Sequence, residues 1–394
     1  MSPGGAPRPP APAPTALDSP ASADRRPGRR HLYEVDVVRL LTFVCVVGVH
    51  SVTSTMSPDS IPTGAFASLL HFTRGTFFIL SAFVLCYAQG STPVRLRRFW
   101  PRRFLYVGLP YVVWTVIYWW IALGATPRVG DLPQLGHELL TGTGNYHLYF
   151  LLVSLRLYLL FPALLWLVRR TAGHHLALFF VSGALELATL AMTHYTSWTG
   201  GWATVRAYDL VLSPTYQFYI VTGALAAVHH ERLHRWVVEH PRAVVAALLA
   251  TAAVHVGVYL HQVPSSGSVF QAYDPLQPSV VPWTVAVTLG LYAAGGVYAA
   301  RRRPGSRLAA FVDQASIVSF GVFLVHPLFL NTVLGPLLAW GYSSLDPTLS
   351  GAIAWGATLA LSYAFAAVAV RTPLALPLAG RRRLSTRPHH ATGA

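Results

Sequence analysis

The sequence contains no lysine, few charged residues and almost no cysteine. Of its 394 residues, 11% are charged and 53% are hydrophobic, which is more apolar surface than one soluble core can bury. The two cysteines, Cys45 and Cys86, lie in separate apolar stretches without Cys-x-x-Cys spacing. Neither a disulfide framework nor a thiolate metal site is supported. We therefore expect a lipid bilayer as the solvent and no metal cofactor.

Arginine alone supplies the positive charge. The formal net charge of +15 would by itself also suit a nucleic-acid-binding protein. Most arginines, however, lie in short clusters between long apolar segments, which is typical of a membrane topology signal. We therefore expect no nucleic-acid partner.

Apolar segments recur along the chain between two basic tails. Residues 1–30 are rich in Pro, Ala and Arg and are predicted to be disordered, and residues 373–394 form the second tail. The run that begins at Val35 is too long for a signal peptide. Segments able to cross a ~30 Å hydrocarbon core are predicted at 35–56, 65–88, 104–124, 146–168, 175–194, 209–229, 242–262, 280–300, 311–333 and 348–370. The predicted fold class is all-α, with one domain of about ten transmembrane helices at residues 31–372.

The arginine clusters alternate from one loop to the next. They follow the second, fourth, sixth and eighth predicted helices and also occur in both tails, whereas the opposite loops carry only Arg128 and Arg206. By the positive-inside rule both termini are cytoplasmic, and the number of helices is even. The expected location is the plasma (cytoplasmic) membrane, with multiple spans.

Two ionisable residues of the first predicted helix share one face. A charge at mid-bilayer costs roughly 2.5–3.5 kcal/mol on insertion scales, so each one needs a reason. Arg39 and His50 are eleven residues apart, which puts them within about 20° of one face and roughly 16 Å apart along the axis. Asp36 can pair with the Arg39 guanidinium from one turn away. An extended phosphopantetheine arm has a comparable reach, with phosphates for Arg39 and a thioester for His50.

A structural alternative exists for both residues. His50 could pack against a neighbouring helix, and Arg39 could anchor the helix at the membrane interface. The depth of His50, about 22 Å into a ~30 Å core when counted from Val35, favours a functional role for this residue. For Arg39 the two interpretations are equally supported.

Five segments resemble, in order, those of the acyltransferase 3 family. Asp36 to His50 follows the family pattern of Asp-x-x-Arg and, after ten residues, His, and residues 77–83 (FFILSAF) are similar to its Phe-Phe-x-x-Ser-Gly-Phe. The other three similar segments are RRFLYVGLPY at 102–111, YHLYFL with YLLFP at 146–162, and SFGVFLVHPL at 319–328. The resemblance covers about residues 31–372.

The resemblance implies a ten-helix enzyme that transfers an acyl group, often acetyl from acetyl-CoA. His50 is then the catalytic residue, and Arg39 with Asp36 binds or positions the donor. The chain departs from the family's Arg-x-x-Arg at the start of the third helix, because Tyr106 follows Arg103 at the second position. The arginines that we expect to bind the donor's phosphates are Arg98, Arg102 and Arg103.

Five further residues are predicted to contribute to substrate binding: Arg74, Ser81, His147, Arg156 and His326. His147 and Arg156 flank the fourth helix and are expected to line an acceptor entrance from outside. His326 precedes Pro327, which should break the helix locally and free backbone groups that need partners.

Arg74 and Ser81 also have structural interpretations. Arg74 is as suited to an ion pair with Asp209 or Glu186 as to catalysis. The Ser81 hydroxyl suits helix packing better than nucleophilic attack, because the sequence places no base beside it.

The function predicted from these residues is that of a membrane O-acyltransferase, a transferase of groups other than amino-acyl groups. It would move a short acyl group, most often acetyl, from acyl-CoA to a hydroxyl of a glycan, a glycolipid or lipid-linked sugar, or a secreted metabolite. His50 would deprotonate that hydroxyl or carry the acyl group itself. The alternatives are a transporter or exporter of a glycan or lipid, with the buried charges along its substrate path, and a sensor or scaffold without chemistry. The expected partners are the lipid bilayer, acyl-CoA and the hydroxyl-bearing acceptor.

Overall fold

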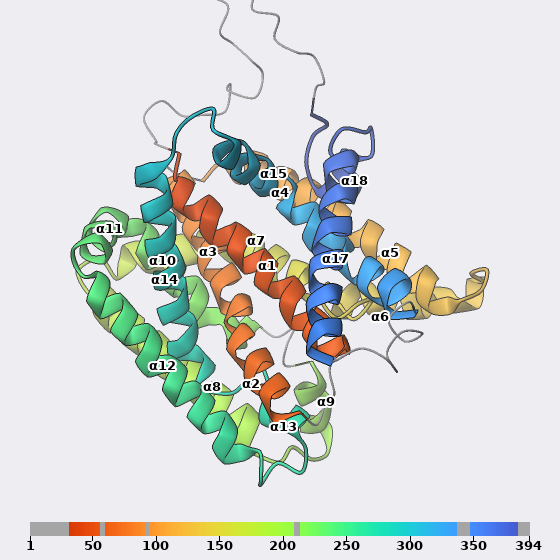
Figure 1. The fold of residues 1–394 in the computed structure, drawn as a ribbon, viewed down its shortest axis with the longest axis horizontal. Helices are drawn as coiled ribbons and strands as arrows, with labels where there is room; N and C mark the ends of the chain where they lie inside the picture. The colour runs from red at the N-terminus through yellow and green to blue at the C-terminus, as the bar shows by residue number, and fades with distance from the viewer. Residues whose placement is uncertain (1–30, 56–59, 91–93, 209–212, 337–346, 385–394) are drawn as a thin grey trace, which may run out of the picture. The chain divides into compact units, whose positions relative to one another are not determined.

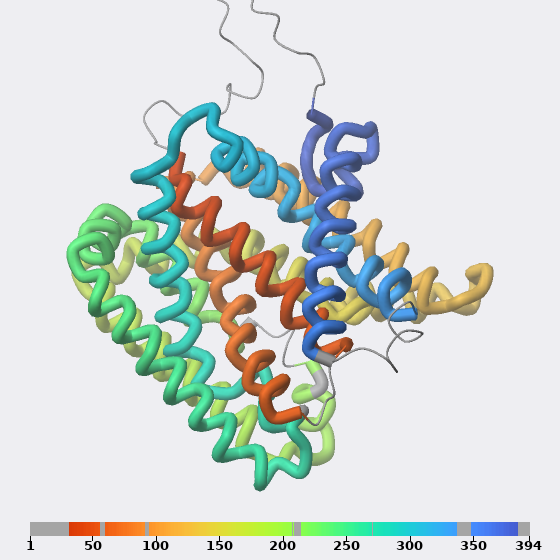
Figure 2. The backbone as a smooth tube through the Cα atoms, in the orientation of Figure 1, coloured from red at the N-terminus to blue at the C-terminus, as the bar shows by residue number. Residues whose placement is uncertain are grey.

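A computed structural model describes residues 31–55, 60–90, 94–208, 213–336 and 347–384. The chain divides into a unit that ends at Leu32 and a unit that begins at Tyr33, and the second unit is described here. Every regular element in its described residues is a helix (Figures 1 and 2). In a bilayer, helices satisfy their own backbone hydrogen bonds, so long apolar segments fold in this way.

The helices follow the predicted segments closely. The longer ones are α1 (Tyr33–Thr55), α2 (Ile61–Leu70), α3 (Phe72–Gln89), α4 (Leu96–Arg103), α5 (Leu109–Leu123), α6 (Leu132–Thr141), α7 (Tyr149–Arg170), α8 (His175–Tyr195), α10 (Gln217–Val228), α11 (His230–Glu239), α12 (Pro241–Gln262), α14 (Val280–Arg301), α15 (Arg307–Pro327) and α17 (Pro347–Ala369). Short elements are η1 (Phe104–Gly108), η2 (Val129–Asp131), α9 (Gly201–Ala207), η3 (Ser213–Tyr216), α13 (Val269–Ala272), η4 (Leu328–Leu334) and α18 (Ala375–Ala379).

Nine helical stretches of the described chain are long and apolar enough to cross a membrane. They correspond to nine of the ten predicted segments. The segment predicted at 209–229 corresponds to η3 and α10, and its residues 209–212 lie outside the described part. The 12 residues of α10 would span about 18 Å at 1.5 Å per residue, less than a ~30 Å core. A tenth span and the side on which the termini lie therefore stay predictions.

The helix α1 lies inside the bundle and packs against α14, α15 and α17. Figure 1 shows α17 and α14 on either side of it. Lipid is as apolar as these side chains, so the helices associate through close packing rather than through removal of water. The α3–α10 contact illustrates this, because a Cβ at Gly223 would lie 2.1 Å from the Ile79 carbonyl oxygen. Only glycine fits at this crossing.

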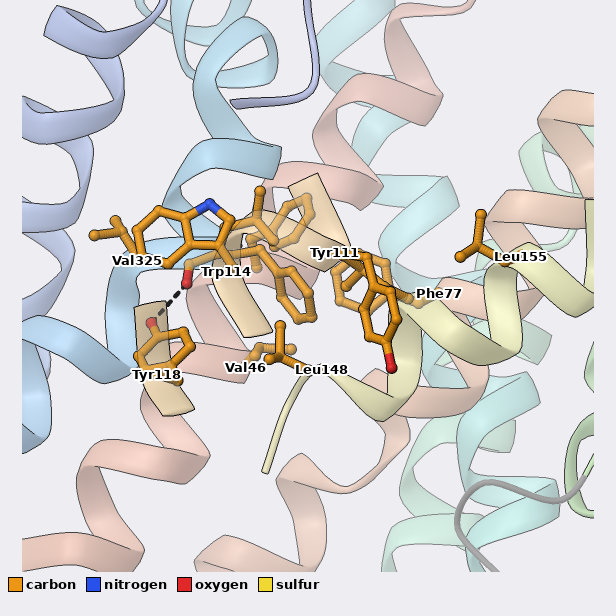
Figure 3. Close-up of a cluster of buried hydrophobic side chains, with 12 residues drawn as sticks. Val46, Phe77, Tyr111, Trp114, Tyr118, Leu148, Leu155 and Val325 are labelled. Atoms are coloured by element: carbon orange, nitrogen blue, oxygen red, sulfur yellow. Dashed lines mark hydrogen bonds between the residues drawn. The ribbon is translucent and has the colours of Figure 1, made fainter. Parts of the chain in front are cut away.

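A compact apolar cluster fixes the middle of the bundle. Its buried side chains come from α1, α3, α5, α7 and α15 and include Val46, Phe77, Trp114 and Val325 (Figure 3). The rings of Phe43 and Phe77 lie 4.6 Å apart at their centroids. This cluster holds α1 and α15 side by side, and their polar residues form the candidate site.

Candidate active site

Three histidines from different segments meet near the later turns of α1. The His50 ring stacks on the His326 ring of α15 at a centroid distance of 5.4 Å. His147, just before α7, lies edge-on to His326 at 5.2 Å, and the Tyr146 ring lies 4.4 Å from His50. We call His50, His147, His326 and Tyr146 the histidine cluster. The three histidines are far apart in the sequence, so the fold alone brings them together.

Pro327 determines how His326 is held. Proline has no N–H, so the carbonyl of Phe323, four residues earlier, loses its helical hydrogen bond. Nδ1 of His326 lies 2.7 Å from that carbonyl oxygen, and because a carbonyl can only accept, Nδ1 carries the proton and Nε2 keeps its lone pair. Nε2 is buried without a hydrogen-bond partner in the described structure. His326 therefore presents a fixed, neutral imidazole beside His50.

The proline changes the helix without interrupting it. The chain continues from α15 directly into the π-helix η4. The prediction that Pro327 breaks the helix is therefore wrong. The prediction that freed backbone groups need partners is confirmed, since His326 caps Phe323 and the Tyr118 hydroxyl donates to the Leu324 carbonyl at 2.8 Å (Figure 3). A π-turn beside a proline is a common way to re-form helical hydrogen bonds.

His147 lies inside the bundle. Its side chain is 3% exposed, its Nδ1 is 3.3 Å from Oδ1 of Asn145, and its ring lies edge-on to Tyr118 at 5.5 Å. The predicted position at an outer entrance is therefore wrong for His147. Arg156, nine residues further along α7, lies near Tyr111 of α5, and no described contact joins it to the histidine cluster.

Several polar side chains here are surrounded by protein yet keep some accessible surface. They are His50, His71, Arg74 and Tyr149. His71 and Arg74 are also close enough to His50 to interact with it electrostatically. These partly accessible side chains could therefore contact a substrate.

Asp36, Arg39 and Ser316 form a second polar group, near the start of α1. Arg39 Nη1 lies 3.5 Å from Asp36 Oδ1, which confirms the pairing predicted from their spacing. Ser316 of α15 accepts a hydrogen bond from Arg39 Nη1 at 3.4 Å and donates one to Asp36 at 2.9 Å. We call these three residues the Asp36–Arg39–Ser316 triangle. The Arg39 side chain keeps 32% of its surface exposed, against 10% for Asp36, so its guanidinium can take a further partner.

The same two helices carry the triangle and the histidine cluster. Arg39 and His50 are eleven residues apart on α1, and their partners Ser316 and His326 are ten residues apart on α15. The helices therefore run in the same direction, with the two groups separated by roughly 15–16 Å at 1.5 Å per residue.

The predicted donor-binding arginines all lie on α4. Arg103 stacks over the rings of Phe99 and Tyr158, at 5.5 Å and 5.6 Å, while Arg98 and Arg102 are exposed. Figure 1 places α4 toward the end of the bundle where α1 and α15 begin. These arginines and the triangle therefore lie toward the same end.

Arg74 and Glu186 do not pair as predicted. Glu186 accepts from the backbone N–H of Phe218 at 3.2 Å and from Nε2 of Gln217 at 3.3 Å. Arg74 lies beside the hydroxyls of Tyr149 and Tyr216 instead. Its other predicted partner, Asp209, lies outside the described residues.

Ser81 lies seven residues after Arg74 on α3 and is partly buried. No described contact joins its hydroxyl to the histidine cluster or to the triangle, and no described base lies beside it. Its assignment to a substrate site therefore stays a prediction.

Comparison with known proteins gives the family. The model of the acyltransferase 3 family, described as an acyltransferase domain, matches residues 32–367. The chain belongs to this family. No curated protein and no solved structure matches it.

Membership of the acyltransferase 3 family makes the protein a membrane acyltransferase. It favours the enzyme over the exporter and the scaffold that the sequence left open. The match covers the described elements from α1 to the last turn of α17, so it includes both polar groups.

Sequence reasoning missed three members of the site. Ser316 closes the triangle, Tyr146 packs on His50, and Tyr118 caps Leu324. A signal existed for Ser316, because it precedes His326 by nearly the same interval that separates Arg39 from His50. The two tyrosines carried no such signal, since contact between α1, α5 and the segment before α7 depends on how the helices pack.

Proposed function

We propose that this membrane acyltransferase moves a short acyl group, most often acetyl, from acyl-CoA to a hydroxyl of an acceptor. The acceptor is a glycan, a glycolipid or lipid-linked sugar, or a secreted metabolite, and the enzyme works in the plasma membrane with both termini inside. One observation carries the proposal: an enclosed histidine pair, His50 and His326, lies one phosphopantetheine length from a partly exposed arginine, Arg39, on the same two helices.

His50 is the proposed general base. It takes the proton of the acceptor hydroxyl, whose oxygen attacks the thioester carbonyl carbon. The C–S bond then breaks, and the CoA sulfur leaves and receives the proton from His50. Nε2 of His326 keeps a lone pair and has no hydrogen-bond partner among the described residues, so it can act as a second proton acceptor in the cluster. The His326 ring orients the His50 ring by stacking on it.

An acyl-histidine intermediate is the alternative within the same site. In that case a ring nitrogen of His50 attacks the thioester first, and the acceptor hydroxyl then removes the acyl group from the ring. The two routes differ in one observable, because only the second gives acylated protein when acceptor is absent.

Arg39 and the arginines of α4 are proposed to hold the donor's phosphates. Arginine binds phosphate oxygens through a planar pair of N–H groups, and the triangle fixes the Arg39 side chain through Asp36 and Ser316. Arg98 and Arg102 are exposed for phosphate contacts, and Arg103 is oriented by its aromatic neighbours.

The proposal is tested with membranes that contain the full-length chain and labelled acetyl-CoA. We expect acetyl label on envelope glycans, lipids or secreted products, detected by mass spectrometry, and none with His50→Ala. The matched control is His174→Ala, which removes an exposed histidine that makes no side-chain cap at the start of α8. Equal label transfer by His50→Ala would contradict the role of His50, and no acyl transfer by the wild type from acetyl-, succinyl- or longer acyl-CoA would contradict the function.

A further inference from the structure

Arg74 is a cation inside the bundle, and no carboxylate of the described residues forms an ion pair with it. It lies on α3 within a membrane-spanning stretch, and its Nη1 is buried without a hydrogen-bond partner in the described structure. The neighbouring tyrosine hydroxyls of Tyr149 and Tyr216 offer dipoles but no charge. Buried charges in proteins are normally paired, because an unpaired one loses its hydration without compensation.

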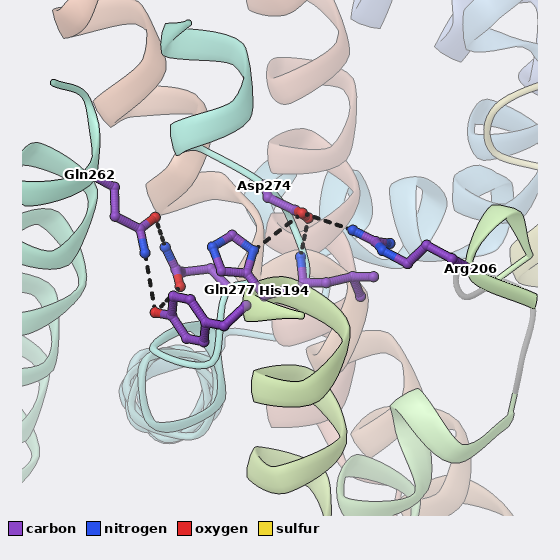
Figure 4. A network of polar contacts seen from close by, with 7 residues as sticks. His194, Arg206, Gln262, Asp274 and Gln277 are labelled. Carbon is purple, nitrogen blue, oxygen red and sulfur yellow. Dashed lines mark hydrogen bonds and ion pairs between the residues drawn. The ribbon is translucent and has the colours of Figure 1, made fainter. Parts of the chain in front are cut away.

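Asp274, whose charge acts on Arg74, is already bound by other groups. It accepts from Nδ1 of His194 at 3.3 Å and from the backbone N–H of Leu276 at 2.8 Å, and Arg206 lies 3.5 Å away (Figure 4). Burial alone would raise the pKa of Asp274, but these hydrogen bonds and charges lower it below its usual value. Asp274 acts on Arg74 through space, but its hydrogen bonds and its ion pair go to other groups.

A groove lies at the end of the bundle where α8 and α12 end. It has a volume of about 1300 Å³, and its wall includes His194, Arg206, Gln262, Gln271 and Asp274. This volume exceeds the roughly 300–1,000 Å³ of most small-molecule sites. Tyr273 also lines the groove, and its ring lies 5.9 Å from the ring of His71. His71 is three residues before Arg74, and both are close enough to His50 to act on it electrostatically.

We propose that Arg74 binds an anionic oxygen group, a carboxylate or a phosphate, of a polar acceptor that enters through this groove. The anionic group would complete the pairing of the guanidinium, whose planar fork fits either oxyanion. The same contact would place a nearby hydroxyl of the acceptor at His50. The inference rests on the proposed function only for the fate of that hydroxyl, and binding itself can be measured without turnover.

Binding of small probes to the purified full-length chain in detergent tests the inference. The probes are glucuronate, glucose 6-phosphate and uncharged glucose, compared at constant ionic strength through the thermal stability that each confers. We expect a charged probe to bind the wild type at least about 10-fold more tightly than glucose, the usual lower limit for a hydrogen-bonded charge. Glucuronate and glucose 6-phosphate separate a carboxylate from a phosphate.

Variants assign the binding to Arg74. Arg74→Gln should weaken binding of the charged probe about 10- to 100-fold and leave binding of glucose unchanged. Arg74→Lys should lose less affinity for the charged probe because it keeps the positive charge. The control Arg128→Gln removes an exposed arginine outside the groove and should bind as the wild type does. If Arg74→Gln does not fold, Arg74→Lys supplies the same comparison.

The outcomes separate this inference from the proposed function. His50→Ala should bind the charged probe normally and yet transfer no acyl group. Normal probe binding by a wild type without acyl transfer would contradict the proposed function alone. Equal binding of glucose and the charged probes, binding of neither charged probe, or unchanged binding in both Arg74 variants would overturn the inference.

Discussion

The two polar groups on α1 and α15 differ in how completely their hydrogen bonds are satisfied. In the triangle, Ser316 accepts from Arg39 and donates to Asp36, so the three side chains fix one another. In the histidine cluster, Nε2 of His326 and Nε2 of His147 are buried and have no partner among the described residues. A buried polar atom without a partner is costly. The triangle therefore holds its side chains in fixed positions, whereas the histidine cluster keeps ring nitrogens that are able to accept a proton.

The largest effect that would test this difference is expected from His326→Asn. Asparagine keeps an N–H near the position of Nδ1 for the Phe323 carbonyl but removes Nε2. We expect kcat for acetyl transfer to fall by about 10²-fold, the lower range for a proton-transfer group. Thermal stability should change little because the cap on α15 remains. An unchanged kcat would show that catalysis needs neither the ring nor Nε2 of His326, and Phe323→Leu is the control for packing.

A smaller effect is expected when the triangle loses its charge. Arg39→Gln should raise KM for acetyl-CoA about 10-fold, because it removes a charge-assisted contact to phosphate, and kcat at saturating donor should stay within a few-fold of wild type. Steady-state kinetics with varied acetyl-CoA measures both. A fall in kcat with unchanged KM would place Arg39 with the histidines and remove the distinction between the two groups.

A smaller effect on KM for acetyl-CoA is expected from Arg103, the arginine of α4 that stacks on aromatic rings. Arg103→Gln is expected to raise KM for acetyl-CoA by roughly 3- to 10-fold, since it removes one of several cations near the donor. Arg128→Gln, outside α4, is the matched control and should leave KM unchanged. Equal kinetics for the two variants would exclude Arg103 from donor binding.

The smallest effect is expected at the edge of the triangle. Ser316→Ala removes two neutral-to-charged hydrogen bonds but leaves the Asp36–Arg39 pair in place. We expect KM for acetyl-CoA to rise about 2- to 5-fold and kcat to stay the same. Ser319→Ala, whose hydroxyl bonds only to the Ser316 carbonyl in the described structure, is the control. A loss of kcat in Ser316→Ala would mean that the triangle controls the histidine cluster.

The sequence predicted most of the helices and, for each polar group, the residues that lie on α1. Apolar length and arginine clusters located nine spans because a bilayer requires long helices, and the spacing of Asp36, Arg39 and His50 is local geometry on one helix. It did not predict that Ser316 and His326 face α1, nor that His147 is buried, because these facts depend on which helices pack together. The Arg74–Glu186 pairing was wrong for the same reason, since Oε2 of Glu186 accepts hydrogen bonds from Gln217 and Phe218 at the start of α10.

The parallel course of α1 and α15 makes the site sensitive to chain length rather than to composition. Most residues between Arg39 and His50 need only be apolar and of suitable size, so most single replacements there should be tolerated. Gly48 is an exception, because a Cβ there would lie 2.8 Å from the Trp355 ring. Adding or deleting one residue in that interval would instead rotate His50 by about 100° away from His326. Natural variation in this segment should therefore consist of exchanges, with insertions and deletions confined to the loops.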